Sequence, residues 1–337
     1  MLVSTANTLA SAQTDLLFAE HIGYSRVVKA VCDEALRAGL TTLHALDGAQ
    51  AAGDPGVIAL QAHGERGTPR ILVYYQTRDV DAVLRLGLPR LGGCGACWVD
   101  GAFTPHTARL LEPYADQTDT FGMLYFEDEE IRRLFGEAHR AGLQISVHCV
   151  GDGAVEQALS AYEVVLTEHP RADHRHRIEH AELIMADQID RARRLGLAFA
   201  IQPAFNHFWR NDEFYPGVIG LERAARVDPV RTLVDAGLLV AGGSDSPVTP
   251  LRPLLGIHSA VNHSNPAERV EAITALRLFT ENAARIGFEE NDKGTLTPGK
   301  LADMVVLGAN PMQVPPSELK DIPVEMTIVG GEVVYYR

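Results

Sequence analysis

A repeating pattern of apolar and polar positions organises most of the chain. Seven times, a stretch with an apolar stripe at helical spacing leads into a short run of apolar and β-branched residues. In several repeats a glycine ends the helical stretch, as Gly39, Gly142 and Gly196 do, which is typical of the turn before a buried parallel strand. The runs predicted as strands are residues 40–46, 70–76, 93–100, 143–149, 174–180, 197–202 and 238–244.

This alternation predicts an α/β protein with a parallel sheet, and its length favours a TIM-like (β/α)8 barrel over an open sheet. A barrel of this kind has eight strands, and the chain opens on residues that read as the helix before the second strand. We therefore expect residues 1–293 to form a barrel that is incomplete at its N-terminus and lacks its first strand. Two helical stretches, 254–262 and 269–286, follow the last predicted barrel strand. Residues 294–337 are rich in strands and turns and predict a small C-terminal β-sandwich portion.

Composition and charge narrow the range of partners. The net charge of -14 argues against nucleic acid or an anionic membrane surface as a partner, and it carries no information about a small-molecule substrate. No apolar run approaches the roughly 20 residues that span a bilayer, and the first residues show no signal-peptide pattern. Four cysteines are too few for a disulfide scaffold at this length, so the expected location is the reducing cytoplasm.

Three polar residues stand at the ends of predicted strands, where barrel enzymes carry their catalytic groups. They are His148, His180 and Asp245. A lone histidine at a strand end is more often a satisfied polar residue than a metal ligand, but three such residues at three strand ends favour a shared site. Two imidazoles and a carboxylate suit a zinc-like ion that keeps one position open for water.

The segments around these residues resemble strands five, six and eight of the amidohydrolase superfamily. They resemble more closely its amidohydrolase family 3, the YtcJ-like group that includes N-substituted formamide deformylases. The resemblance extends from about residue 27 to the C-terminus, and the combination of motifs is specific although each is short. The further matching segments are residues 100–116, 201–204, 280–287 and 294–307.

The resemblance implies a metal-dependent hydrolase that acts on carbon–nitrogen bonds other than peptide bonds, in an amide or an N-acyl or N-formyl amine. His148 and His180 would hold a divalent metal, expected to be zinc. Asp245 would share that site and also act as the catalytic proton shuttle, from the attacking water to the leaving nitrogen. An open seam between strand edges would also favour a homo-oligomer.

Two departures from the family pattern bear on the metal. The His-x-His of the family's first strand is not found in that position: His174 and His176 have the spacing but belong to the sixth-strand segment, where we interpret them as a polar strand entrance. The position of the family's bridging lysine is Ala96. We therefore expect weak or partial metal binding. The alternative hypothesis is a catalytically inactive, N-terminally truncated homologue or a partner-binding fragment.

Other residues have weaker signals. Cys94 and Cys97 form a Cys-x-x-Cys within a predicted strand; we interpret them as inert packing residues rather than a redox pair, with Cys97 as a metal ligand in place of the lysine as the alternative. Asp152, Glu179 and Glu182 would orient imidazoles or cap helices. The substrate-pocket candidates are His44, His106, Asn206 and His207, with exposed loop positions as the alternative.

Overall fold

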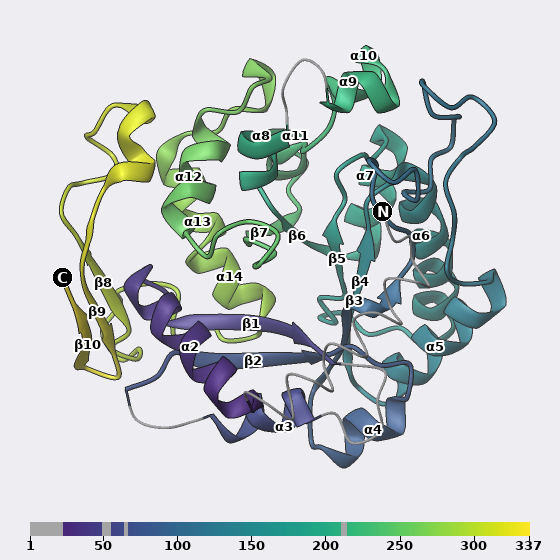
Figure 1. Cartoon of the computed structure of the whole chain (residues 1–337). Coiled ribbons are helices and arrows are strands. Elements are labelled where there is room, and N and C mark those ends of the chain that lie inside the picture. The colour runs from purple at the N-terminus through teal and green to yellow at the C-terminus, as the bar shows by residue number, and fades with distance from the viewer. Residues whose placement is uncertain (1–22, 49–54, 64–66, 210–213) are drawn as a thin grey trace.

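Seven parallel strands form one curled sheet in the order in which they occur along the chain. The computed structural model describes residues 23–48, 55–63, 67–209 and 214–337. Each strand pairs with the next in sequence, and β1 and β7 are the two edges of this sheet in the part of the chain described (Figure 1). The strands are β1 (Thr42–Asp47), β2 (Arg70–Tyr75), β3 (Arg90–Trp98), β4 (Gln144–Cys149), β5 (Arg177–His180), β6 (Ala198–Ile201) and β7 (Leu239–Gly242).

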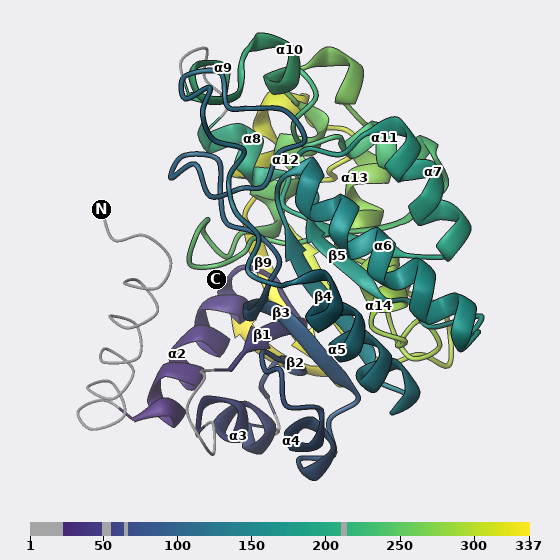
Figure 2. The same cartoon turned by 90° about the vertical axis from the view of Figure 1, so that its right-hand side faces the viewer.

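Helices alternate with these strands and cover the outer face of the sheet. Figure 2 shows α5 and α6 along the outside of β4, with α7 beside α6. The alternating helices are α2 (Tyr24–Arg37), α3 (Pro55–Ala62), α4 (Val80–Arg85), α5 (Asp128–Arg140), α6 (Asp152–Glu168), α7 (Ala186–Leu195) and α11 (Val230–Asp235). The predicted fold class is thereby confirmed: a TIM-like arrangement of parallel strands and helices. Among the described residues, no helix is both long enough and apolar enough to cross a bilayer.

The strand β4 shows how the sheet separates two environments. Ile145, Val147 and Cys149 are buried in the hydrophobic core between the sheet and its helices. Because side chains alternate along a strand, Gln144, Ser146 and His148 face the concave interior. His148 is therefore placed on the inner face by the same pattern that buries its apolar neighbours.

Polar and charged side chains occupy part of the interior of the curled sheet. Arg177 of β5 is only 2% exposed and forms an ion pair with Glu179 on the same strand. Its guanidinium lies 3.9 Å from the centre of the Tyr74 ring and donates to His44 Nδ1 over 3.1 Å. Burial, with the charge of Arg177 next in size, holds the pKa of His44 well below its usual range, so the neutral ring can accept this bond.

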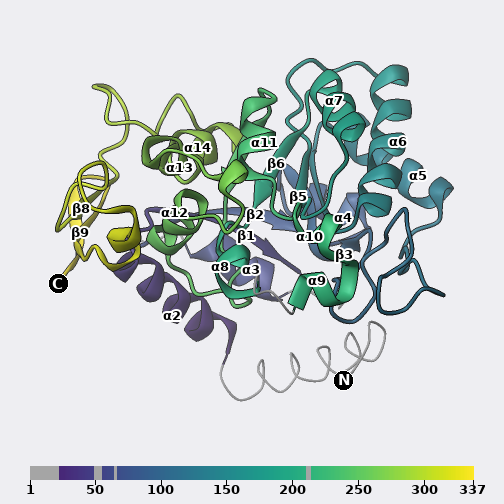
Figure 3. The ribbon, with the colours of Figure 1, turned by 90° about the horizontal axis from the view of Figure 1, so that it is seen from above.

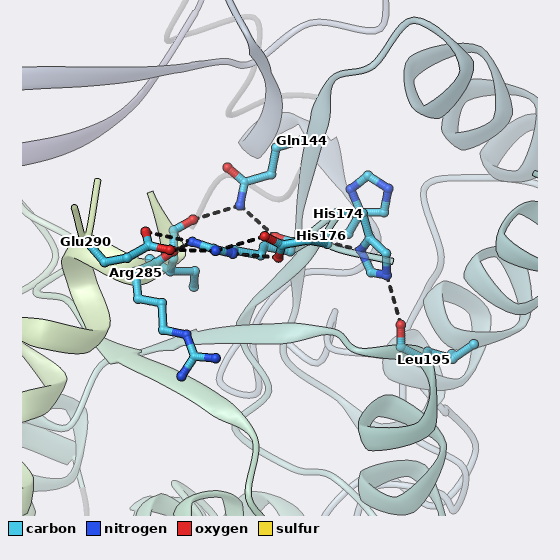
Figure 4. Close-up of polar contacts among 9 residues, drawn as sticks. Gln144, His174, His176, Leu195, Arg285 and Glu290 are labelled. Carbon is cyan, nitrogen blue, oxygen red and sulfur yellow. Dashed lines mark hydrogen bonds and ion pairs between the residues drawn. The ribbon is translucent and has the colours of Figure 1, made fainter. Parts of the chain in front are cut away.

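Hydrogen bonds close the opposite end of the sheet from His148 (Figure 4). Gln144 donates to the carbonyl oxygens of Arg175 and Ile286, over 2.6 and 2.9 Å. Arg175 forms an ion pair with Glu290 at 2.6 Å. These bonds connect the segment before β5 to the end of α14 (Glu281–Ile286) and to the residues that follow it.

His174 and His176 lie in this closed end, not near the candidate site. His174 Nε2 donates to the Leu195 carbonyl over 2.8 Å, and its Nδ1 accepts from the His176 backbone N–H. His176 Nδ1 accepts from the Ile145 N–H, and its Nε2 is 2.8 Å from His139 Nδ1. Both rings are buried, and each uses both of its nitrogens in hydrogen bonds to the protein. The two histidines therefore form part of the packed entrance to β5.

The helical stretch predicted over residues 269–286 is interrupted. It forms α13 (Ala272–Leu278) and α14, separated by Phe279 and Thr280. The Phe279 ring packs between Gly242 of β7 and Gly256 of α12 (Pro253–Val261): a Cβ on either glycine would lie 2.5 Å or less from a ring atom. The break in the helix allows the ring to occupy this gap.

The last part of the chain forms a separate antiparallel sheet in the order β10–β9–β8. Seen from above, this sheet lies beside α2 and α12 at one side of the molecule (Figure 3). Thr327 Oγ1 donates to the Leu36 carbonyl over 2.6 Å, and Arg70 pairs with Asp303 at 2.7 Å. The strands are β8 (Met304–Leu307), β9 (Val324–Val329) and β10 (Glu332–Tyr336).

Candidate active site

The three residues singled out at strand ends line one cavity. His148 lies at the end of β4, His180 ends β5, and Asp245 follows β7 in a turn. All three border a cavity of about 480 Å3. The fold thus brings together groups from three strand ends, as expected at the carboxyl end of a parallel barrel.

The two imidazoles are in contact and their tautomers are defined by their partners. Their ring centroids are 4.5 Å apart with the planes inclined at 69°. His148 Nε2 lies 2.9 Å from the Gly101 carbonyl oxygen, which only accepts, so this nitrogen carries the proton. His180 Nδ1 lies 2.8 Å from Gln202 Oε1, while the Gln202 amide nitrogen donates to the Ala200 carbonyl. In the neutral rings the lone pairs are then on His148 Nδ1 and His180 Nε2.

Burial sets the protonation states of the site. It holds the pKa of His148 well below its usual range, with the neighbouring His180 as a second cause, and lowers the pKa of His180 to about 4. Both rings are therefore neutral near pH 7, the form that binds metals. Burial has the opposite effect on a carboxyl group and raises the pKa of Asp245 to about 6.

The backbone of the site adopts the left-handed conformation that residues other than glycine rarely take. The φ angles are 71° at His180, 48° at Ala181 and 53° at Asp245. Such conformations cost free energy and cluster at functional sites. Two of the three candidate residues therefore hold positions that local propensity alone does not favour.

Asp100 joins the loops on both sides of His148. Its carboxylate accepts from the backbone N–H groups of Arg109, Val150 and Gly151 at 2.8, 2.9 and 2.8 Å. One of its oxygens lies 3.7 Å from His148 Nε2. Burial raises the pKa of Asp100 to about 8, although the three hydrogen bonds act in the opposite direction. The sequence signal for this role was the Asp-Gly pair at residues 100–101, whose glycine is required because a Cβ would lie 2.0 Å from Thr107 Oγ1.

A second carboxyl group, that of Glu182, also borders the cavity, and the Tyr215 hydroxyl donates to it over 2.7 Å. The pKa of Glu182 is raised to about 7, mainly by burial; the Tyr215 hydrogen bond acts in the opposite direction, and the negative charge of Asp245 adds to the rise. Aromatic side chains form most of the remaining wall of the cavity. They belong to Trp98, Phe103, Phe205, Trp209, Phe214 and Tyr215.

Four pocket candidates from the sequence are not among the described residues that line this cavity. His44 lies in the polar interior beside Arg177. His106 pairs with Asp116 at 2.9 Å. Asn206, on α8 (Ala204–Trp209), exchanges hydrogen bonds with Ser264, and His207 is exposed with its ring 5.7 Å from that of His258.

Cys97, the alternative metal ligand suggested by the sequence, also lies outside the cavity. Cys97 is fully buried in the core between the sheet and its helices, with its Sγ 3.5 Å from the Thr77 carbonyl oxygen. Burial raises the pKa of its thiol to about 12, which opposes a thiolate. The side chains of Cys94 and Ala96 lie outside the described part of the structure.

His148, His180 and Asp245 are residue types that bind divalent metals, but their arrangement fits a shared metal ion only partly. Two neutral imidazoles and a carboxylate on one cavity are the groups that hold catalytic zinc. Among the described residues, however, no three His, Cys, Asp or Glu side chains are close enough together to bind one ion. The imidazole pair is therefore the core of any such centre.

Comparison with known proteins identifies a family that this chain matches. A model of the amidohydrolase family matches residues 5–335. YtcJ of Bacillus subtilis, named as an amidohydrolase, is 36% identical over 259 residues, which are 73% of this chain and 47% of YtcJ. The N-substituted formamide deformylase of Arthrobacter pascens is 30% identical over 262 residues, which are 73% of this chain and 46% of that enzyme. The chain thus spans about half the length of these two relatives.

A solved structure resembles this fold closely. It is an uncharacterized metal-dependent hydrolase from Pyrococcus furiosus, with a TM-score of 0.77 and 28% sequence identity. The match covers 90% of this chain and 64% of that one. The curled parallel sheet described above is therefore shared with a protein of this kind.

Proposed function

Because this chain belongs to the amidohydrolase family, we propose that its cavity hydrolyses a carbon–nitrogen bond other than a peptide bond, in an amide or an N-acyl or N-formyl amine. The observation that carries this proposal is the pair of neutral imidazoles, 4.5 Å apart, on one cavity with the Asp245 carboxyl group. The named activity of the Arthrobacter pascens relative supports the N-acyl amine class.

The proposed cofactor is a divalent metal, with zinc as the expected ion. His148 would bind it through Nδ1 and His180 through Nε2, the nitrogens that their hydrogen bonds leave as acceptors. When bound, such a metal lowers the pKa of water from 15.7 to roughly 7 and polarises a carbonyl group. Two imidazoles alone hold a metal weakly, so we expect partial occupancy with the described residues.

Asp245 supplies the proton transfer. A carboxyl group with a pKa raised to about 6 exists in both protonation states near neutral pH. It can therefore accept a proton from the attacking water and deliver it to the leaving nitrogen. The aromatic wall binds apolar parts of the substrate and excludes bulk water from this step.

A second proposal is a partner-binding protein without turnover. Two observations favour it: the described residues do not assemble three metal ligands, and β1 and β7 have no neighbour on their outer edges within the described sheet. Unpaired strand edges favour association with another chain. In this case the imidazole pair would have a structural role only.

Amine release from N-formylbenzylamine and N-acetylbenzylamine, with added Zn2+, separates the two proposals. The hydrolase proposal predicts faint but measurable turnover that falls by at least about 100-fold on Asp245→Asn, because the proton transfer is lost. His169→Ala, which removes an exposed imidazole, serves as the control and leaves turnover unchanged. Absence of turnover at any metal concentration favours the partner-binding protein, whereas turnover that Asp245→Asn leaves intact contradicts the proton-transfer role of Asp245.

A further inference from the structure

Two carboxyl groups, those of Glu182 and Asp245, border the cavity. In the part of the chain that the structure describes, no lysine or arginine lines the cavity. A positive charge in the cavity would stabilise the ionised form of both carboxyl groups, so the cavity is suited to a cationic ligand.

Glu182 is bonded to a tyrosine that belongs to a cluster of aromatic rings on the cavity wall. Tyr215 donates its hydroxyl hydrogen to the Glu182 carboxylate over 2.7 Å. The Phe103 ring packs edge-to-face on Tyr215, with centroids 5.4 Å apart and planes at 83°. The ring centroid of Phe214 also lies 5.6 Å from that of Tyr215. Aromatic faces attract cations, and a carboxylate beside them adds to that attraction.

We propose that Glu182, together with Tyr215 and Phe103, forms a subsite for a positively charged ammonium group of the substrate. The hydrolysed compound would then be an amide that carries a protonated amino group elsewhere in the molecule. This inference rests on the proposed function, in which Asp245 transfers protons and the imidazole pair holds the metal. Glu182 has neither task, and its charge is left to face the substrate.

A purely structural role for Glu182 is the competing explanation, because its bond to Tyr215 ties it to α9 (Phe214–Ile219). Two substitutions separate these roles. Glu182→Gln keeps an oxygen that accepts the Tyr215 hydrogen bond but removes the negative charge. Tyr215→Phe removes the hydrogen bond but keeps the charge.

Tryptophan fluorescence reports binding directly, since both tryptophans of the chain, Trp98 and Trp209, line the cavity. The full chain is titrated without added metal at about pH 8, where an ammonium and a carboxylate are both charged. The probes are benzylammonium and the neutral benzyl alcohol. We expect benzylammonium to bind about tenfold more tightly, a difference of about 1.4 kcal/mol.

The variants decide what causes this preference. Glu182→Gln abolishes it, while Tyr215→Phe and the exposed control Glu137→Gln retain it. Equal affinities for the two probes in the unaltered chain overturn the proposal. A preference that survives Glu182→Gln and disappears on Asp245→Asn overturns the assignment to Glu182. None of these outcomes depends on turnover, so failure of the hydrolase proposal is recognised separately, by absent amide hydrolysis.

Discussion

The imidazole rings of His148 and His180 meet at 4.5 Å, centroid to centroid, at the ends of neighbouring strands. The register of β4 and β5, which pairs Cys149 with His180, sets this distance. The left-handed backbone at His180 then turns its ring toward the concave side. The contact between two buried, neutral rings is the structural basis of the proposed metal centre.

Gln202 defines the tautomer of His180, and we expect its removal to weaken metal binding. Gln202→Leu takes away the oxygen that accepts from His180 Nδ1. Loss of such a partner typically costs about 10- to 100-fold in metal affinity. Competition of Zn2+ against a fluorescent chelator measures the change. Gln313→Leu, on an exposed residue, is the matched control, and equal losses in both variants would show that Gln202 has no specific role.

The ion pair of Arg177 and Glu179 is expected to stabilise the fold strongly as a pair. Arg177→Met leaves the Glu179 carboxylate, 3% exposed, without its partner. Breaking a buried pair in this way costs about 3–5 kcal/mol, and urea unfolding measures the loss. The double variant with Glu179→Gln should recover part of this free energy. Arg132→Met, at an exposed pair, should change stability by about 0–1 kcal/mol; a similar small effect at Arg177 contradicts the account.

The histidines of the closed end predict a pH dependence of folding. Burial lowers the pKa of His139 and of His174, and holds that of His176 well below its usual range. Because protonation favours the unfolded chain, their contribution to stability is complete above pH ~6.5, the pKa of an unfolded histidine. It is lost as pH falls below that value, by up to about 1.4 kcal/mol per pH unit for each histidine.

Urea unfolding between about pH 7.5 and pH 5.5 tests this dependence. His176→Asn removes one of the titrating groups, so the variant should lose stability less steeply than the unaltered chain, whatever its absolute stability. A slope that the substitution leaves the same would show that His176 is not responsible.

Much of the fold is predictable because its signals are local. The glycines that end helices and the apolar runs that follow them place each of the seven barrel strands within three residues of the observed start. The strand ends then identify His148, His180 and Asp245 as residues of one cavity. The small C-terminal sheet follows from the same reasoning.

The walls of the cavity could not be predicted because they depend on which face of a short element is turned inward. Phe205 and Trp209, four residues apart on α8, face the cavity, while Asn206 between them bonds to Ser264. His44 lies within β1 rather than at its end, where strand alternation directs it to Arg177. Both orientations depend on tertiary contacts, which the local sequence pattern does not reveal.

Direct measurement of bound metal tests the central claim, that His148 and His180 together hold a divalent ion. The full chain, His148→Ala, His180→Ala and the exposed control His169→Ala are dialysed against Zn2+ and analysed for metal content at matched protein concentration. We predict weak, sub-stoichiometric binding that both site variants lose and His169→Ala keeps. Binding that persists unchanged in both His148→Ala and His180→Ala would contradict it.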